Sequence, residues 1–235
     1  MESIRQDRPR RSRTKLPGRG VDLAPRLNDG LGALGLTLPD ADRRRLLDYV
    51  ELLGKWNQVY NLTAIRDPEQ MLIQHVFDSL AIVAPLRRYL AATAHPTAID
   101  VGSGAGLPGI PLAIAWPDLS VSLVEPVGKK AAFLRQALAA LGLSNVTVEQ
   151  CRIEALPAGP KAPDVVISRA FASLANFIHG IDPLVKRGSL IAAMKGQPPS
   201  AELAELDRNW ALIESISLRV PGLDAPRHLL LLARS

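Results

Sequence analysis

The stretch Thr97-Ala98-Ile99-Asp100-Val101-Gly102-Ser103-Gly104-Ala105-Gly106 decides the fold of this chain. It starts as a short apolar strand, reaches an acid and then places glycine at three alternate positions. The residues from Pro108 to Ala115 favour a helix directly after it. Glycine lets a backbone turn sharply and lets a ligand approach closely. A strand, such a loop and a helix N-terminus together predict a cradle for a bound cofactor.

From residue 96 onward, short apolar runs alternate with segments that favour helices, which predicts a doubly wound parallel sheet. The link from Pro221 to Asp224 is short for a parallel crossover, so we expect the last two strands to pair as an antiparallel hairpin. The fold class is therefore α/β and Rossmann-like, with a mostly parallel seven-stranded sheet. The predicted strands are 98–101, 121–124, 146–149, 165–167, 190–193, 212–220 and 228–233, and the predicted helices are 108–115, 129–141 and 174–185.

A small helical unit is expected in front of the sheet, over residues 23–95. Residues 23–34 favour a short helix, and Pro39 occupies the expected first position of a longer one. A third helix is predicted from Asp67-Pro68 through Val83. We thus divide the chain into a basic disordered tail (1–22), the helical unit (23–95) and the α/β domain (96–235).

The net charge of +5 belongs to the tail. Of the 28 Lys and Arg residues, seven fall in the first 20 positions, together with only two of the 23 acids, so the rest of the chain is balanced. Such a tail either gathers along polyanions or is simply solvated. No apolar run reaches the roughly 20 residues that span a bilayer. A single cysteine and four scattered histidines indicate no metal site. We expect a cytoplasmic protein with no membrane association.

The spacing of the glycines separates three cofactor classes. A triphosphate loop requires a lysine after a longer glycine spacing, and none is present. A nicotinamide loop, G-x-G-x-x-G, would place its third glycine at Leu107. The order acid-x-Gly102-x-Gly104-x-Gly106 instead resembles the loop of class I methyltransferases, which bind S-adenosylmethionine. Glu125 ends the next predicted strand, where a carboxylate can accept both ribose hydroxyls of a nucleoside.

The loop that follows the third predicted strand supplies a further candidate contact. In the class I methyltransferase fold, this loop lies beside the adenine of the cofactor, and backbone groups near Glu154 would form hydrogen bonds with the edge of that base. Ile153 would pack on its face, although a plain core position is an equal interpretation of this residue.

The residues after the third and fourth predicted strands narrow the choice of the atom that is methylated. Cys151 lacks the preceding proline typical of a nucleophile in pyrimidine methylation. The turn from Ser168 to Phe171 lacks the polar acceptor and prolines used for exocyclic amines. A ring nitrogen needs no deprotonation, so catalysis would be mainly in-line positioning. We expect Arg169 to position the substrate or the cofactor. Phe171 either stacks on a base or, as we favour, packs in the core.

Five segments resemble the bacterial family of small-subunit ribosomal RNA guanine-N7 methyltransferases, also known as glucose-inhibited division protein B. They are Trp56–Thr63, His75–Leu80, Asp100–Leu112, Gly128–Leu134 and Ile167–Ala172. The resemblance implies methyl transfer from S-adenosylmethionine to N7 of a guanine in 16S RNA (the guanine 527 class), with 16S rRNA or the small ribosomal subunit as the partner. We expect a monomer. The resemblance implies no assigned general base. It places cofactor contacts at Gly102, Leu107, Ile153, Glu154 and Arg169, beside Gly104 and Glu125.

Other polar groups have two interpretations each. The pairs Asn57/Asn61 and His75/Asp78 each share one helical face. They either tie the helical unit to the α/β domain, which we favour, or line the RNA path. The cations Lys129, Lys130 and Arg135 either meet RNA phosphates or form a solvated helix face. Two other functions stay open at this stage: a nicotinamide oxidoreductase and a non-catalytic ribosome-binding protein.

Overall fold

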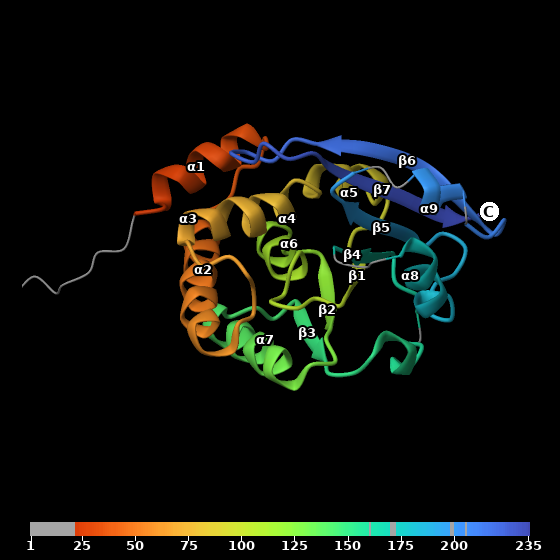
Figure 1. Cartoon of the computed structure of the whole chain (residues 1–235), viewed down its shortest axis with the longest axis horizontal. Helices are drawn as coiled ribbons and strands as arrows, with labels where there is room; N and C mark the ends of the chain where they lie inside the picture. Colours follow the sequence, from red (N-terminus) through yellow and green to blue (C-terminus); the bar gives the residue numbers. More distant parts are fainter. Residues whose placement is uncertain (1–21, 160, 170–172, 198–199, 205) are drawn as a thin grey trace, which may run out of the picture.

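The fold is given by a computed structural model that describes residues 22–159, 161–169, 173–197, 200–204 and 206–235 (Figure 1). The predicted tail up to residue 21 and Phe171 lie outside the described residues. Helices stand on both sides of a central sheet, and α1 (Ala24–Ala33) lies near one edge strand of that sheet. No helix in the described part of the chain has the length and apolarity to cross a membrane.

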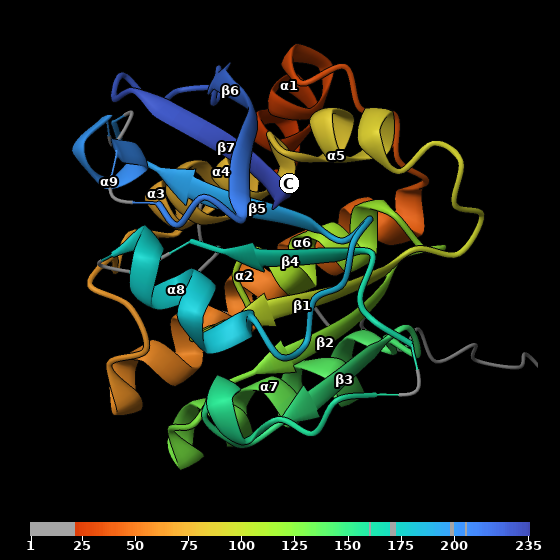
Figure 2. The same ribbon diagram turned by 90° about the vertical axis from the view of Figure 1, so that its right-hand side faces the viewer.

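The sheet has seven strands in the order β3-β2-β1-β4-β5-β7-β6 (Figure 2). Every pairing from β3 to β5 is parallel, whereas β7 pairs antiparallel with both β5 and β6. The predicted mostly parallel sheet with a terminal antiparallel hairpin is confirmed. The strand bounds are β1 Thr97–Val101, β2 Ser120–Val124, β3 Val146–Glu149, β4 Val165–Ser168, β5 Leu190–Lys195, β6 Trp210–Leu218 and β7 Arg227–Arg234.

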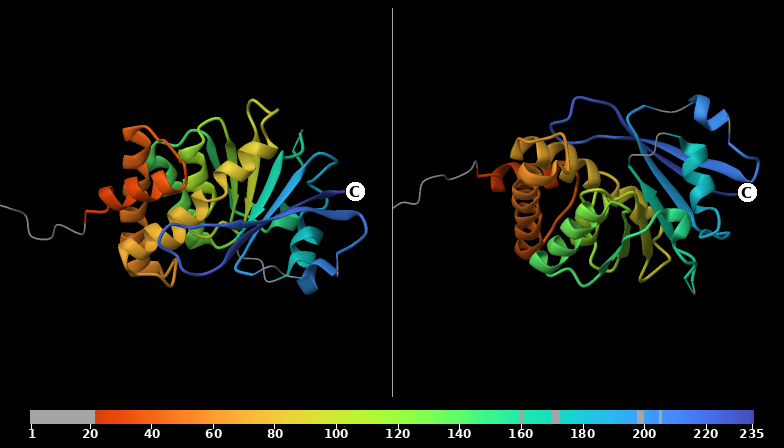
Figure 3. Two further views of the ribbon diagram at one scale, coloured as in Figure 1. Left: turned by 90° about the horizontal axis from the view of Figure 1, so that it is seen from above. Right: turned by 60° about the horizontal axis from the view of Figure 1, so that its bottom comes forward.

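Both faces of the sheet are covered, because the central strands are apolar on both sides. In β7, Leu229 and Leu231 belong to one buried cluster, and Leu230 and Leu232 to the other. This explains the unbroken leucine run. The first face carries α6 (Gly109–Ala115) and α7 (Gly128–Leu141), and the second carries η2 (Ile153–Ala155), α8 (Leu174–Ile181) and α9 (Ser200–Ala204) (Figure 3).

Two helix predictions need correction. The helix predicted over 174–185 ends at Ile181, because Pro183 lacks the N–H that would continue the ladder. The helix predicted from Asp67-Pro68 to Val83 is divided into α3 (Pro68–Met71), the π-helical turn η1 (Leu72–Phe77), α4 (Asp78–Leu80) and α5 (Val83–Tyr89). In the wide turn, the His75 carbonyl accepts a hydrogen bond from Ser79 Oγ at 2.6 Å.

The N-terminal helices share one buried cluster with the first face of the sheet. The long helix α2 (Asp40–Tyr60), which is capped by Pro39 rather than beginning at it, lies against α6 and α7. Tyr49 of α2 is fully buried, and its hydroxyl donates to the carbonyl of Ala105 at 2.7 Å. α2 is thereby fixed to the glycine loop. The change at residue 95/96 is a change of secondary structure, and as a domain boundary it stays a prediction.

Candidate functional site

The glycine loop lies at the edge where the parallel strands end, next to the point where the strand order reverses around β1. Gly102, Gly104 and Gly106 have φ values of +68°, +58° and +84°. These left-handed conformations are strained for residues with a Cβ. The backbone therefore requires glycine at all three alternate positions, which explains the pattern in the sequence.

The glycines differ in what surrounds them. A Cβ on Gly106 would lie 2.4 Å from Ile110 Cδ1, and one on Gly109 would lie 2.3 Å from Leu123 Cδ2. These two positions need glycine for close packing. A Cβ on Gly102 would have no heavy atom within 4 Å, and one on Gly104 would be 3.9 Å from its nearest neighbour. The first half of the loop therefore faces open space that a ligand can enter.

Acidic and hydroxyl groups surround this space. Glu125 is buried at the end of β2, and its carboxylate accepts hydrogen bonds from the Gly104 and Val127 amides at 2.8 Å each. Asp100 is fully buried and accepts from the Gly109 amide through Oδ2 at 2.9 Å. Its Oδ1 and the hydroxyls of Ser103 and Ser168 are buried without a partner among the described residues. Burial raises the pKa of Asp100 to about 7. Unpartnered buried polar atoms of this kind are typical of a site that a polar ligand completes.

Three further predicted cofactor contacts make no side-chain hydrogen bond to this loop among the described residues. The Leu107 side chain is buried in the cluster on the first face. Ile153 is buried in the cluster on the second face, where its Cγ2 is 3.1 Å from the position of a Cβ on Gly180. Glu154 is exposed in η2. The core interpretation of Ile153 therefore agrees with its packing, and only its outer surface is left for a ligand.

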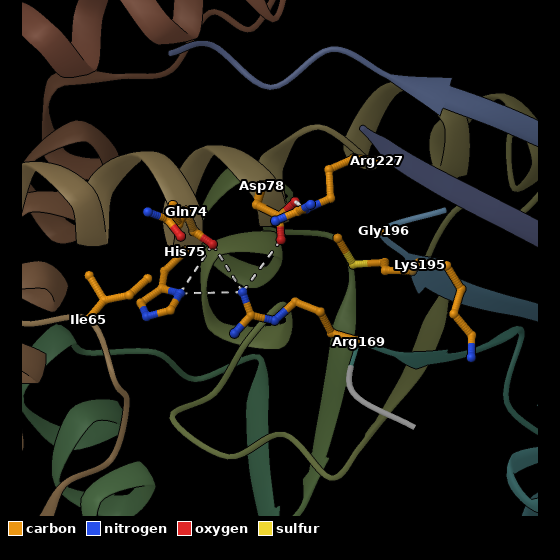
Figure 4. Close-up of a pocket in the computed structure, with 9 residues that line it drawn as sticks. Ile65, Gln74, His75, Asp78, Arg169, Lys195, Gly196 and Arg227 are labelled. Carbon is orange, nitrogen blue, oxygen red and sulfur yellow. Dashed lines mark hydrogen bonds and ion pairs between the residues drawn. The ribbon is translucent and has the colours of Figure 1, made fainter. Parts of the chain in front are cut away.

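A cleft of about 430 Å³ adjoins the loop at the ends of β4 and β5 (Figure 4). The π-helical turn forms one wall, and Arg169 extends toward that wall from the end of β4. Three cationic side chains and one acid line the cleft, which suits a ligand that is itself anionic or rich in hydrogen-bond acceptors. The lining residues are Ile65, Gln74, His75, Asp78, Arg169, Met194, Lys195, Gly196 and Arg227.

Asp78 connects two of these cations. Its side chain is only 4% exposed, and its carboxylate accepts from Arg227 Nε at 3.1 Å and from Arg169 NH1 at 3.5 Å. Arg169 NH1 also donates to the Gln74 carbonyl at 3.2 Å. Burial raises the pKa of Asp78, and the two guanidinium groups oppose that shift. Asp78 thus fixes the two arginines at one wall of the cleft and joins the helical unit to the α/β domain.

His75 is a second buried polar group in this wall. Its Nε2 lies 2.8 Å from Thr63 Oγ1, and its Nδ1 lies 3.1 Å from the Gln74 carbonyl oxygen and 3.4 Å from Arg169 NH1. Burial and then the positive charge of Arg169 lower its pKa to about 4. The imidazole is therefore neutral near pH 7. The expectation that His75 and Asp78 tie the two parts of the chain together agrees with these contacts.

The asparagines of α2 differ from each other. Asn57 is buried, donates to the Ile65 carbonyl at 2.9 Å and accepts from the Thr63 amide at 2.8 Å. It holds the loop that ends at α3. Asn61 is exposed at the end of α2, with a φ of +48° that ends the helix, and it accepts from Arg66 at 3.0 Å.

Sequence reasoning missed Gln74, Lys195 and Arg227 in the cleft. The signal that singled out Arg169, a cation at the end of an apolar strand, also applies to Lys195 at the end of β5. The same signal applies to Arg227, because β7 runs antiparallel to β5 and therefore begins at the edge of the sheet where β5 ends. Lys195 is paired with Glu202 at 3.0 Å. Gln74 contributes its backbone carbonyl, for which the sequence holds no signal.

The predicted phosphate contacts lie on α7, beside the loop. Lys129 is exposed, Lys130 is partly buried and neither is in an ion pair among the described residues. Arg135 donates to the side chain of Gln150 at 3.0 Å. Phe171, the predicted stacking residue, lies outside the described part of the chain.

Two solved structures, TrmN from Thermus thermophilus and the N-methyltransferase NodS from Bradyrhizobium japonicum WM9, each align with a TM-score of 0.53. They are 19% and 12% identical and cover 67% and 77% of this chain, and 49% and 98% of their own. At this identity the likeness shows the fold alone, which is the class I methyltransferase fold.

Curated relatives are much closer in sequence. Proteins named ribosomal RNA small subunit methyltransferase G from Burkholderia pseudomallei (strain 668) and Burkholderia mallei (strain NCTC 10229) are each 53% identical over 207 residues. These alignments span 87% of this chain and 88% and 89% of the relatives. The family model GidB, described as rRNA small subunit methyltransferase G, matches residues 42–230. The chain therefore belongs to the GidB family of rRNA small subunit methyltransferases.

Proposed function

We propose that this chain transfers a methyl group from S-adenosylmethionine to N7 of a guanine in 16S ribosomal RNA. The observation that carries the proposal is the placement of an open glycine loop beside a cationic cleft, at one edge of a methyltransferase sheet. Membership of the rRNA methyltransferase family supplies the class of substrate.

The residues around the loop fit S-adenosylmethionine. The open side of Gly102 and Gly104 and the backbone of Leu107 would receive its amino-acid part, close to the unpartnered Asp100 Oδ1. Glu125 would accept the ribose hydroxyls through lone pairs that its two backbone hydrogen bonds leave free. Ile153 and Glu154 would flank the adenine. When bound, this cofactor supplies an electrophilic methyl group on a sulfonium.

The cleft would hold the guanine. Guanine presents O6 next to N7, and an arginine is its commonest specific partner on this edge. Because N7 must stay free to react, the guanidinium groups of Arg169 and Arg227 would donate to O6 or to a neighbouring phosphate. Arg169 directs only NH1 toward the wall, so its NH2 and Nε are available for this role.

No described group in the cleft is poised to take a proton. His75 is already paired with Thr63, Asp78 with two arginines and Lys195 with Glu202. N7 carries a lone pair and needs no base, so the residues position the guanine rather than deprotonate it. A cysteine mechanism on a pyrimidine is disfavoured as well, because burial raises the pKa of the Cys151 thiol.

The test is transfer of label from radioactive S-adenosylmethionine to naked 16S RNA and to small ribosomal subunits that lack the mark, followed by nucleoside analysis. We expect label in 7-methylguanosine of the RNA. Label in a pyrimidine, an exocyclic amine or protein would contradict the proposal. Parallel binding titrations with NADH and S-adenosylmethionine distinguish the proposed methyltransferase from the oxidoreductase alternative. RNA binding without turnover identifies a non-catalytic ribosome-binding protein.

A further inference from the structure

The C-terminal end of α2 carries an unexpected exposed apolar surface. Five large apolar side chains are exposed among the described residues, and three of them are Val59 (71%), Tyr60 (40%) and Val127 (40%). Val59 and Tyr60 end α2, and Val127 caps the start of α7. The first two belong to a segment that sequence analysis singled out but that the proposed chemistry does not use.

Contacts at both ends of α2 and α7 show that the helix ends that carry these three residues are neighbours. Near the start of α2, Arg45 Nε donates to the carbonyl of Leu141 at the end of α7, at 3.1 Å. Near the end of α2, the Trp56 ring lies 5.6 Å from that of Phe133, near the start of α7. The helices are therefore antiparallel. Figure 2 shows the end of α2 beside the start of α7, at the edge where the parallel strands end.

Tyr60 extends this aromatic contact to the surface. Its ring centroid is 5.0 Å from that of Trp56, with the planes tilted by 32°. The partly buried Trp56 thus fixes an aromatic ring that stays open to solvent on its outer side. A rigid, exposed ring is the platform on which an unpaired base stacks.

Three cationic residues belong to or contact the same two helix ends. Lys129 and Lys130 lie one turn before Phe133 on α7, and Arg66 is held at the tip of α2 by its hydrogen bond to Asn61. None of the three is in an ion pair among the described residues. Unpaired cations beside an exposed aromatic ring complement the phosphates and bases of a single strand.

Resting on the proposed function, we infer that this surface, which we call the α2 tip (Val59, Tyr60, Arg66, Val127, Lys129 and Lys130), binds single-stranded RNA next to the target guanine. An unpaired base stacks on Tyr60, and neighbouring phosphates meet the three cations. The tip adjoins the glycine loop, because α7 follows directly from Glu125. It therefore holds the strand that enters the cleft.

The first test measures RNA KM, S-adenosylmethionine KM and kcat of the full chain with unmethylated small ribosomal subunits. We expect Tyr60→Ala to raise the RNA KM about tenfold, the scale of one lost stacking contact. Tyr60→Phe should stay within twofold, because it keeps the ring. Ile213→Ala, at an exposed apolar position on β6, is the matched control and should change nothing. An unchanged RNA KM for Tyr60→Ala overturns the inference, and so does a rise confined to the S-adenosylmethionine KM.

The second test measures direct binding to the same subunits as a function of salt, without turnover. The double variant Lys129→Gln/Lys130→Gln should lower the salt slope by about one to two. Arg44→Gln changes an exposed position near the opposite end of α2 that is in no ion pair within the described part of the chain, and it should leave the slope unchanged. A slope equal to that of the unmodified chain overturns the inference. If the unmodified chain binds subunits but transfers no methyl group, the proposed function fails while this binding test still decides the role of the tip.

Discussion

Asp78 is the residue on which the cationic cleft depends. One buried carboxylate holds Arg169 from the end of β4 and Arg227 from the start of β7, although 149 positions separate Arg227 from Asp78. The sheet brings these strand ends together, and the π-helical turn places the acid between them. The arginines are thereby oriented before any ligand arrives.

We expect Asp78→Asn to lower kcat/KM for RNA by about 10- to 100-fold, because misplaced positioning groups slow a reaction that relies on orientation. Unfolding free energy should fall by about 2 to 3 kcal/mol, less than for a fully buried pair, since both arginine side chains remain about a quarter exposed. The control is Asp182→Asn, which removes an exposed pair with Arg234 and should cost under about 0.5 kcal/mol. Steady-state kinetics and denaturant unfolding measure both. Equal effects of the two substitutions would contradict the role of Asp78.

The lowered pKa of His75 leads us to expect that the stability of the folded chain depends on pH. Its pKa is about 4 in the folded chain and 6.5 as its ordinary value, so the unfolded chain binds the extra proton between these values. Stability from this group is present above pH 6.5 and is lost as pH falls toward 4. Because the carboxyls of Asp78 and Asp100 have raised pKa values and act in the opposite sense, the comparison must be with His75→Gln. The free-energy difference between unmodified chain and variant should shrink by about 2 kcal/mol from pH 7 to pH 5. A constant difference would show that the imidazole is not buried in neutral form.

At the level of helices and loops, two glycines distinguish the effect of backbone strain from the effect of filling the space where the ligand would bind. Gly104 and Gly142 have φ values of +58° and +63°, and a Cβ on either would meet nothing closer than 3.9 Å. Alanine at either position should cost about 1 to 2 kcal/mol of stability through the backbone. Only Gly104→Ala should also weaken S-adenosylmethionine binding, by about tenfold or more. Calorimetric titration of both variants measures this, and equal affinities would place the cofactor elsewhere.

The same elements show what the sequence can predict. Short apolar runs between turn residues predict all seven strands. The signal is strongest for β4, β5 and β7, whose central residues are buried on both faces of the sheet, whereas β6 has exposed and partly buried positions between its two buried ends. The division of the helix after Asp67 was not predicted. The segment makes tertiary contacts that the local sequence does not show, such as the hydrogen bond that the Gln74 carbonyl accepts from Arg169, 95 residues away. Arg227 was missed for a similar reason, since only the antiparallel placement of β7 brings it to the site.

At the scale of the whole molecule, the N-terminal helices and the sheet form the site jointly. α2 is bonded to the glycine loop through Tyr49, and the π-helical turn forms a wall of the cleft. Ile65, which also lines the cleft, is next in sequence to Arg66 of the α2 tip. The N-terminal helices therefore contact the glycine loop and the cleft, the two places where we propose that the cofactor and the guanine bind. We propose that this arrangement positions a guanine so that its N7 reacts directly.

A substrate that lacks only the guanine N7 tests whether this atom accepts the methyl group. Small ribosomal subunits would be reconstituted with 16S RNA containing either guanosine or 7-deazaguanosine, which replaces N7 by a carbon without a lone pair. Methyl transfer and direct binding of the full chain would be measured on both. We expect transfer to the guanosine subunits, no transfer to the deaza subunits, and binding affinities for the two that agree within a few fold. Transfer of label to the deaza subunits at an undiminished rate would contradict the proposal.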